Sequence, residues 1–389
     1  MPRSSRGKSS AKAARTRLRA GAFWFAVFAA TLVAGGFLFA WSGLYSVAAT
    51  RGHWPGFGLI LEFGMRSSVR THAIGIAVPK LDDPALAELG AAHFQGGCAP
   101  CHGAPGAPPS PIVRAMLPEP PDLGVSVPSW RPKELFWIVK HGLKYTGMPA
   151  WPTQTRDDEV WALVTFLQRL PQLDRVGYRS LSSLEPREEA GPIRALVQGG
   201  PLGTGLAACS RCHGLDGAGR ASGAFPRLDI QTADYLLAQL QAYAAGARPS
   251  GIMQPVAAEL DAAEMRRLAD YYAAQLPPQT RAPVGGENEP LSLGRRLATV
   301  GLPERGIPPC DSCHADQVAT RHALYPALAG QYAGHTSRQL ELLASGKRRG
   351  SPAAEIMSVI AQRLTAEQID AVAAYLAGLP PRRARAGAP

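Results

Sequence analysis

The sequence predicts an all-α protein with three similar domains in tandem behind an N-terminal transmembrane helix. Three observations support this fold class. The motif Cys-x-x-Cys-His occurs three times, roughly 100 residues apart, and contains all six cysteines of the 389-residue chain. Each motif is followed, near the end of its domain, by a helix-start signal and apolar residues at helical spacing. An uncharged stretch precedes all three motifs and is long enough to cross a bilayer.

The N-terminal region predicts a single membrane anchor. Residues 1–19 form a basic tail with seven Lys/Arg and no acidic residue, and residues 20–50 carry no charge. A spanning helix needs about 20 apolar residues, and its basic flank stays in the cytoplasm. A cleaved signal peptide is the alternative, although its apolar region normally runs only about 7–15 residues. The juxtamembrane segment, residues 51–81, reads equally well as a plain tether or as an interfacial segment lying on the membrane.

The net charge of +11 arises mainly from the basic N-terminal tail and so bears on membrane orientation. Seven of the 41 Lys/Arg lie in the first 19 residues, which leaves 34 basic against 30 acidic residues in the rest of the chain. So small an excess does not indicate a nucleic-acid partner.

An internal repeat defines the domains. Seven residues of the second domain recur 100 positions later in the third: Pro226, Leu228, Gln231, Gln239, Leu240, Gly246 and Arg248. Both domains end in a helix with a capping signal, at Asp261 with Glu264 and at Thr365 with Gln368, and the first domain has a more distant version capped at Thr155. We therefore expect domains at 82–171, 196–276 and 291–380, with polar, turn-rich linkers at 172–195 and 277–290. The first linker predicts a movable first domain.

The repeated motif indicates haem attachment. Two thiols three residues apart lie on one side of a helical turn and can form thioethers to the two vinyl groups of one porphyrin, with the adjacent histidine under the iron. A redox dithiol would need a strand–turn–helix context, and zinc would need four ligands from paired motifs. The sequence therefore predicts three covalently bound haem c groups. Their attachment residues are Cys98, Cys101, Cys209, Cys212, Cys310 and Cys313, and their iron ligands are His102, His213 and His314.

Three methionines are the candidate second iron ligands. Met148, Met253 and Met357 follow the motif histidines by 46, 40 and 43 residues, in Pro/Gly-rich loops before the last helix of each domain. A lone methionine would be read as a flexible core residue, and this is our interpretation of Met265, inside a helix. Met116 has no counterpart in the other domains and is taken as a loop residue. His322 is the nearest alternative ligand for the third iron.

From residue 82 onward the sequence resembles the cytochrome c superfamily. The second and third domains resemble the tandem di-haem cytochromes c of the c4 type, which carry CHG…PRLAGQ…YL..QL…G.R…M in each half. The first domain, with TGMPAWP before its last helix and with Gly90 and Phe94 in its first, is similar to single-haem domains of oxidase-associated membrane cytochromes. In two departures, Ala315 replaces the glycine after the third motif, and the first helices of the second and third domains lack the aromatic residue.

The resemblance implies an electron-transfer protein without catalytic residues. Three haems with both axial positions filled would pass electrons at the periplasmic face of a bacterial inner membrane, within a respiratory chain and toward a terminal oxidase. The implied partners are redox proteins: a terminal oxidase, a quinol-oxidising complex or a dehydrogenase. One alternative is the cytochrome subunit of a periplasmic dehydrogenase that oxidises alcohols or sugars. A di-haem peroxidase-like enzyme is less favoured, because it needs one iron with an open position.

Overall fold

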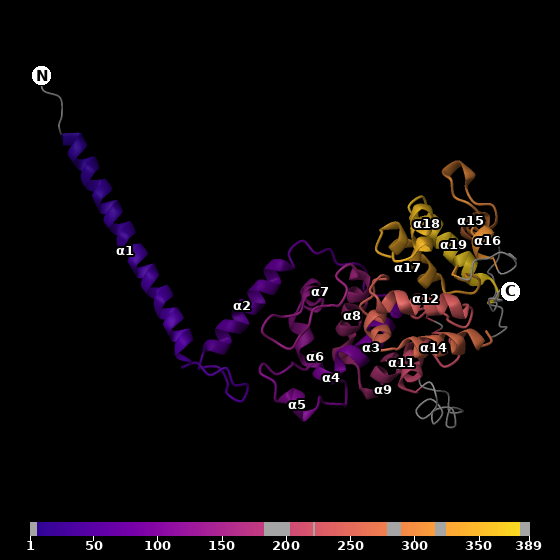
Figure 1. Cartoon of the computed structure of the whole chain (residues 1–389), viewed down its shortest axis with the longest axis horizontal. Helices are drawn as coiled ribbons and strands as arrows, with labels where there is room; N and C mark the ends of the chain where they lie inside the picture. The colour runs from indigo at the N-terminus through magenta and orange to yellow at the C-terminus, as the bar shows by residue number, and fades with distance from the viewer. Residues whose placement is uncertain (1–5, 183–202, 221, 278–288, 316–323, 382–389) are drawn as a thin grey trace, which may run out of the picture. The chain divides into compact units, whose positions relative to one another are not determined.

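The computed structural model describes residues 6–182, 203–220, 222–277, 289–315 and 324–381. Throughout these residues the regular structure is helical, and the β-contacts are two isolated bridges, Ala104–Ala107 and Leu302–Ile307. The all-α prediction is therefore confirmed (Figure 1). The chain divides into two compact units, residues 1–61 and 62–389, which are described separately below.

The first unit contains one helix suited to a membrane. Helix α1 (Arg6–Ser42) includes an apolar stretch, Arg17–Ser42, with a mean hydropathy of 2.0 and no buried residue. Its exposed large apolar side chains include Phe23, Trp24, Phe37 and Trp41. The helix ends eight residues before the expected position 50, since Gly43 leaves helical geometry with a φ of 66°. By length and composition alone, α1 can cross a bilayer.

The second unit holds the three domains. Helix α2 (Phe57–His72) leads into it, with the Arg66 guanidinium 4.7 Å from the centre of the Trp130 ring. The first domain then consists of α3 (Pro84–Gly97), α4 (Ala99–His102), α5 (Pro111–Arg114), α6 (Leu123–Ser126), η1 (Val127–Ser129), α7 (Pro132–His141), α8 (Asp157–Arg169), η2 (Leu170–Gln172) and α9 (Arg175–Ser182).

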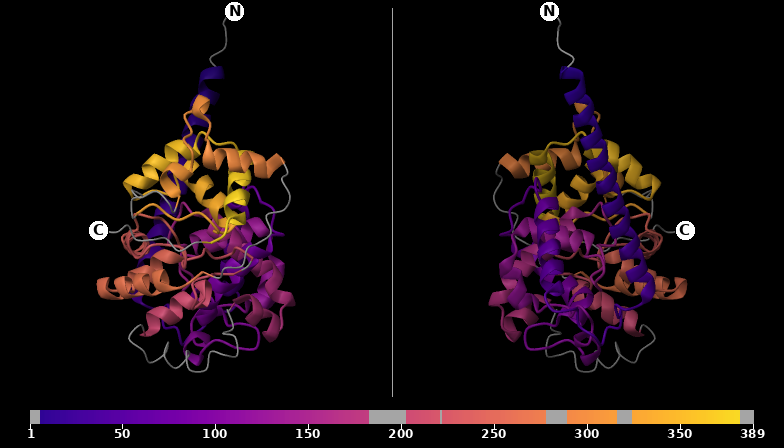
Figure 2. Two further views of the ribbon diagram at one scale, coloured as in Figure 1. Left: turned by 90° about the vertical axis from the view of Figure 1, so that its right-hand side faces the viewer. Right: turned by 90° about the vertical axis from the view of Figure 1, so that its left-hand side faces the viewer.

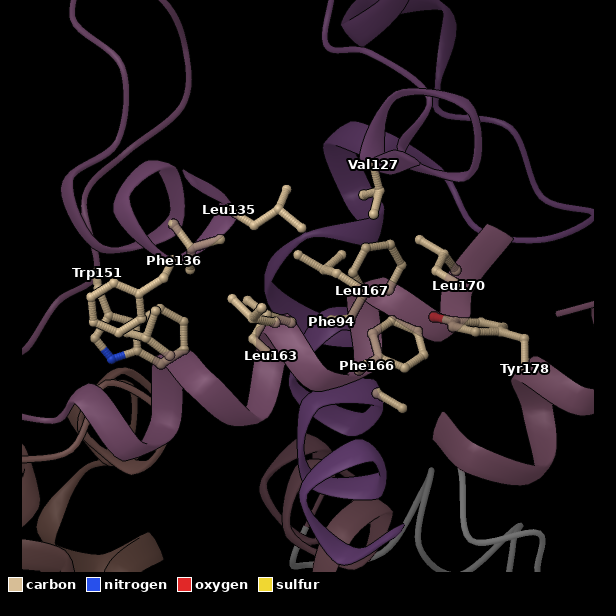
Figure 3. Close-up of a cluster of buried hydrophobic side chains, with 14 residues drawn as sticks. Phe94, Val127, Leu135, Phe136, Trp151, Leu163, Phe166, Leu167, Leu170 and Tyr178 are labelled. Atoms are coloured by element: carbon tan, nitrogen blue, oxygen red, sulfur yellow. The ribbon is translucent and has the colours of Figure 1, made fainter. Parts of the chain in front are cut away.

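A close crossing of α3 and α8 forms the centre of the first domain. A Cβ added to Gly90 would lie 2.3 Å from the Ala162 carbonyl oxygen, so only glycine permits this approach. One turn later, the Phe94 ring packs 5.2 Å from the Phe166 ring (Figure 3). The expected small-then-aromatic pair therefore does pack the first helix against the last. The N-cap position of α8 is Arg156, not Thr155, and no side chain caps it; the first turn carries three acidic residues that suit a helix N-terminus.

Part of the expected first linker belongs to the first domain. Residues 175–182 form α9, and the buried Tyr178 ring contacts both Phe94 and Phe166. Its hydroxyl donates to the Gln95 side chain at 2.5 Å. The apolar face of this short helix, Tyr178 with Leu181, completes the core and explains why the polar composition did not reveal it. The remainder of that linker, from 183 on, lies outside the described residues.

The second and third domains repeat one helical plan. The second has α11 (Gly203–His213), α12 (Ala233–Ala244), α13 (Met253–Ala258) and α14 (Ala262–Ala274). The third has α15 (Glu289–Thr299), η4 (Pro303–Arg305), α16 (Asp311–His314), α17 (Ala333–Ala344), α18 (Pro352–Ala361) and α19 (Ala366–Gly378). The predicted capping boxes at Asp261 and Thr365 are both confirmed.

The helix crossing is kept in the third domain, although its first helix, α15, has no aromatic residue. A Cβ on Gly294 of α15 would lie 2.1 Å from the Ala371 carbonyl oxygen of α19, as at Gly90 in the first domain. Tyr375 of α19 approaches Gly294 as Phe166 approaches Gly90, and it packs against a core that includes Leu297 and Leu376.

Reciprocal glutamines join the second and third domains. Gln231 donates to and accepts from the backbone of Ala327, both at 2.9 Å, and Gln331 does the same with the backbone of Arg227 at 3.0 and 3.1 Å. The two residues are equivalent in the repeat, so this contact has approximate two-fold symmetry. Figure 2 shows the second domain, rose to orange, beside the yellow third domain.

Candidate functional site

The three motifs place their cysteines and histidine on one turn of helix. The Cys98 carbonyl accepts from the His102 amide at 2.9 Å, and the Cys310 carbonyl accepts from the His314 amide at the same distance. The second motif ends α11, which runs without interruption to His213. All six thiols are free. Each site therefore presents two thiols and one imidazole from a single turn, which is the donor set that attaches a haem c.

Each motif histidine is held by a proline carbonyl. Nδ1 lies 2.9 Å from the Pro121 oxygen in His102, 3.2 Å from Pro226 in His213, and 2.9 Å from Pro326 in His314. A carbonyl only accepts, so Nδ1 carries the proton and Nε2 keeps its lone pair for a metal. Recurrence of Pro226 at 326 was the available sequence signal. Pro121 was not recognisable, because it follows its histidine by 19 residues instead of 13 or 12.

Before a haem is attached, the first cysteine of each motif would be a neutral thiol. Burial, with a smaller contribution from neighbouring ionisable groups, raises the pKa of Cys98 and Cys209 to about 12 and that of Cys310 to about 11. A redox-active dithiol needs the opposite, a lowered pKa that supplies thiolate near pH 7. The microenvironment therefore does not favour a thioredoxin-like role.

A cavity of about 440 Å³ opens beside His102. Apolar groups such as Phe94, Leu123 and Leu170 line it together with the polar side chains of Arg114 and Asp122. A porphyrin needs an apolar enclosure with a few polar groups for its carboxylates, and this lining fits that need. Met148 is not among the residues that line the cavity.

The three predicted methionine ligands have different local settings. Met148 is half-buried in the loop between α7 and α8, where its amide donates to the Thr146 hydroxyl at 3.1 Å. Met253 is the first residue of α13, so it lies at a helix start and not in the expected loop. Met357 does not lie in a loop, as expected, but inside α18, because Ser351 caps that helix and Pro352 begins it. Its side chain packs against the cluster of Leu343, Ala354 and Ala361.

Met116, interpreted from sequence as an unremarkable loop residue, lies next to the first methionine loop. A Cβ on Gly147 would meet the Met116 methyl at 2.5 Å. The Met116 thioether therefore lies beside Gly147, the residue that precedes Met148. The alternative ligand His322 lies outside the described residues. In the described part of the chain, no three His, Cys, Asp or Glu side chains gather as a protein-only metal site.

Comparison with known proteins agrees with this geometry. The family model "Cytochrome c" matches residues 203–273 and 309–380, and the model "Cytochrome C oxidase, cbb3-type, subunit III" matches residues 85–167. A thiosulfate dehydrogenase electron acceptor from Stutzerimonas stutzeri is 37% identical over 183 residues, which are 47% of this chain and 83% of that protein. The chain belongs to the cytochrome c family.

Further relatives define the type of cytochrome c. Cytochrome c4 from Stutzerimonas stutzeri is 31% identical over 189 residues, which are 45% of this chain and 85% of that protein. The solved cytochrome c4 of Acidithiobacillus ferrooxidans is 34% identical, with a TM-score of 0.39 and coverage of 45% of this chain and 99% of that one. This protein is thus a multi-haem cytochrome c with a c4-like di-haem module, and it is an electron-transfer protein.

Proposed function

We propose that this cytochrome c carries three covalent haems and relays single electrons at the periplasmic face of a bacterial inner membrane, toward a terminal oxidase. The main support for this proposal is one arrangement that occurs three times. In each, a Cys-x-x-Cys turn is followed by a histidine whose Nδ1 donates its proton to a proline carbonyl. Haem c, when bound, supplies reversible one-electron oxidation and reduction of iron. The protein's own residues hold, orient and shield it.

The roles of these residues follow from their atoms. Each cysteine pair would anchor one porphyrin, and Nε2 of His102, His213 and His314 would bind the irons. The thioether sulfurs of Met148, Met253 and Met357 would supply the second protein ligand of each iron, and an iron with two protein ligands suits electron transfer and not substrate binding. The proline carbonyls fix the imidazole planes, since a ligand held by a second hydrogen bond does not rotate.

The two halves of the cytochrome suggest a direction of electron flow. The c4-like half is similar to proteins named as electron acceptors of thiosulfate dehydrogenase, so we place the entry of electrons there, from a periplasmic dehydrogenase. The first domain matches a model of an oxidase subunit, so we place the exit toward a terminal oxidase there. Helix α1 would anchor the chain, with the basic tail in the cytoplasm. A permanent complex with the dehydrogenase is the alternative assembly.

Spectroscopy of the full-length protein tests the haem count and the ligands. A pyridine haemochrome assay should give three haems c per chain. The iron–thioether absorption band of the oxidised protein should fall by about a third in each of Met148→Leu, Met253→Leu and Met357→Leu. Met265→Leu, a buried residue of α14, is the control and should keep the full band. A band that falls in Met116→Leu but not in Met148→Leu would assign the first iron to the other methionine.

The partners are tested on detergent-solubilised membranes. We expect the cytochrome to co-purify with an oxidase, and its removal to stop oxygen uptake driven by the dehydrogenase. Unchanged oxygen uptake without the cytochrome would contradict a relay between these two enzymes.

A further inference from the structure

The turn that precedes Met253 is enclosed by the first domain. The Pro249 carbonyl accepts from Arg156 at 2.8 Å, and the Gln254 side chain accepts from the Thr153 hydroxyl at 3.2 Å. Ile252 packs against the hydrophobic core of the first domain. Trp151, at one end of that core (Figure 3), lies against Gly251, where an added Cβ would meet the indole nitrogen at 2.0 Å. Contacts from another domain therefore surround a residue proposed as an iron ligand.

One buried carboxylate forms the centre of this contact. Glu159 of α8 is 4% exposed. Its Oε1 accepts from the Ser250 hydroxyl, and its Oε2 accepts from the Gly251 amide, both at 2.6 Å. The Trp151 indole also donates to Oε2 at 3.3 Å, and Arg156 pairs with Oε1 at 3.0 Å. A buried carboxylate with this many donors is held in one geometry, and charge-assisted bonds of this length are strong.

Ser250 transmits this geometry to the methionine. Its hydroxyl oxygen accepts from the Met253 amide at 3.0 Å and from the Ile252 amide at 3.3 Å. A hydroxyl has a single proton, and here Glu159 receives it, so the oxygen lone pairs remain for the two amides. Glu159, Ser250 and the Met253 backbone thus form one continuous chain of hydrogen bonds across the domain boundary.

The third domain builds the equivalent segment differently. Ser351 caps α18 by accepting from the Ala354 amide at 3.2 Å, and Met357 lies one and a half turns inside the helix. The backbone hydrogen bonds of α18 therefore position Met357. In the second domain α13 begins only at Met253, so the preceding turn has no helix of its own to fix it.

We propose that Glu159 is a positioning residue for the second haem. From the first domain, it fixes the turn that presents the Met253 sulfur to the second iron, so that docking of the first domain sets the axial bond and the reduction potential of its neighbour. The proposal rests on Met253 being the ligand, as proposed above, and adds that this ligand depends on a different domain.

The test is Glu159→Gln in the full-length holoprotein. Glutamine keeps one acceptor oxygen but turns an amide NH₂ toward either the Gly251 amide or the Ser250 hydroxyl, so one of the two bonds is lost. We expect loss of as much as a third of the iron–thioether band and a lower midpoint potential for one of the three haems, at unchanged haem content. Ser250→Ala should reproduce both effects, and the double variant should be no worse than either single one.

Glu134→Gln is the matched control. Glu134 is also a buried glutamate of the first domain paired with an arginine, Arg131, but it lies at the start of α7 and caps that helix. The Glu134→Gln variant should lower the stability of the first domain but leave the iron–thioether band and the midpoint potentials of all three haems unchanged. Equal spectra for Glu159→Gln and the wild type would overturn the proposal, as would equal effects of the two glutamine variants. A full band in Met253→Leu would instead refute the ligand assignment on which the proposal rests.

Discussion

Each motif histidine uses one ring nitrogen to hold its orientation, and the other is the proposed iron ligand. The acceptor is a backbone oxygen in every case, from Pro121, Pro226 or Pro326. No side-chain substitution of the proline removes that oxygen, so the path of the loop determines the imidazole plane. This arrangement makes ligand orientation a property of the fold around the motif as well as of the motif itself.

His93 gives a pH-dependent prediction at the residue scale. Burial, and secondarily the nearby Arg211, lowers its pKa from 6.5 to about 4, and its ring lies 4.7 Å from the Trp151 ring. Above pH 6.5 the imidazole is neutral in both the folded and the unfolded chain. Between pH 6.5 and 4 the unfolded chain binds a proton that the folded chain excludes, so stability falls as the pH drops through this window. The loss is about 2 kcal/mol at pH 5.

Denaturant unfolding at pH 7 and pH 5 measures this effect. The variant His93→Gln has no titrating imidazole, so its free energy of unfolding should change less between the two pH values than that of the wild type. Equal changes in both proteins would show that His93 is protonated in the folded state.

At the scale of elements, the glycine crossing of α3 and α8 gives a second prediction. Gly90→Ala places a methyl group 2.3 Å from the Ala162 carbonyl oxygen, and the two helices must separate. We expect a loss of about 1–3 kcal/mol in the free energy of unfolding. Gly334→Ala, in α17, is the matched control, because a Cβ there meets nothing within 4 Å. It should be neutral or stabilising by up to about 1 kcal/mol. Thermal unfolding of both variants tests this prediction. Equal melting temperatures of Gly90→Ala and Gly334→Ala would contradict a close crossing of α3 and α8 at Gly90.

The sequence predicts those elements whose ends are determined by residues close together along the chain. The caps at Asp261 and Thr365 were predictable because the capping box lies within four consecutive residues. The cap of α8 and the place of Met357 inside α18 were not, since each depends on which of several neighbouring polar residues and prolines begins the helix. Helix α9 was missed because its stability comes from packing of Tyr178 on α3 and α8, not from its own composition.

The site shows the same division. The motif cysteines and histidines could be named from spacing alone, and the structure places each set on one helical turn. Glu159 could not be named, because its partners Ser250 and Gly251 lie more than 90 residues away along the chain. A contact between domains leaves no periodic or local signal in one sequence.

At the scale of the whole molecule, the reciprocal glutamines predict how the c4-like half unfolds. Gln231→Leu leaves the amide and carbonyl of Ala327 buried without their partner. Each unsatisfied buried group costs about 1–3 kcal/mol, so the loss of both bonds should weaken the docking of the two domains by about 2–6 kcal/mol. The control is Gln275→Leu, which removes the hydrogen bond from the Gln275 side chain to the Tyr271 carbonyl at the C-terminal end of α14. Limited proteolysis of the second and third domains should accelerate in the first variant only. Equal cleavage rates would show that these bonds do not hold the domains together.

Docking on both sides of the second domain also predicts the order of the relay. The sequence suggested a movable first domain, but buried hydrogen bonds tie it to Ser250 and Gly251, while Gln231 and Gln331 join the second domain to the third. We predict that electrons entering at the third domain cross the second haem before they reach the first. Replacing a methionine ligand with histidine lowers the reduction potential, so Met253→His makes the middle step unfavourable.

The relay order is measured by comparing the two ends of the chain. In Met253→His, stopped-flow reduction of the third haem by a soluble donor should keep its wild-type rate. Oxygen uptake through the oxidase should fall at least as far as in Met148→His, because every electron crosses the altered haem. Met357→His should instead slow the first reduction. If Met253→His leaves oxygen uptake intact while Met148→His and Met357→His reduce it, electrons bypass the second haem. The tight contact made through Glu159 would then serve assembly and not conduction.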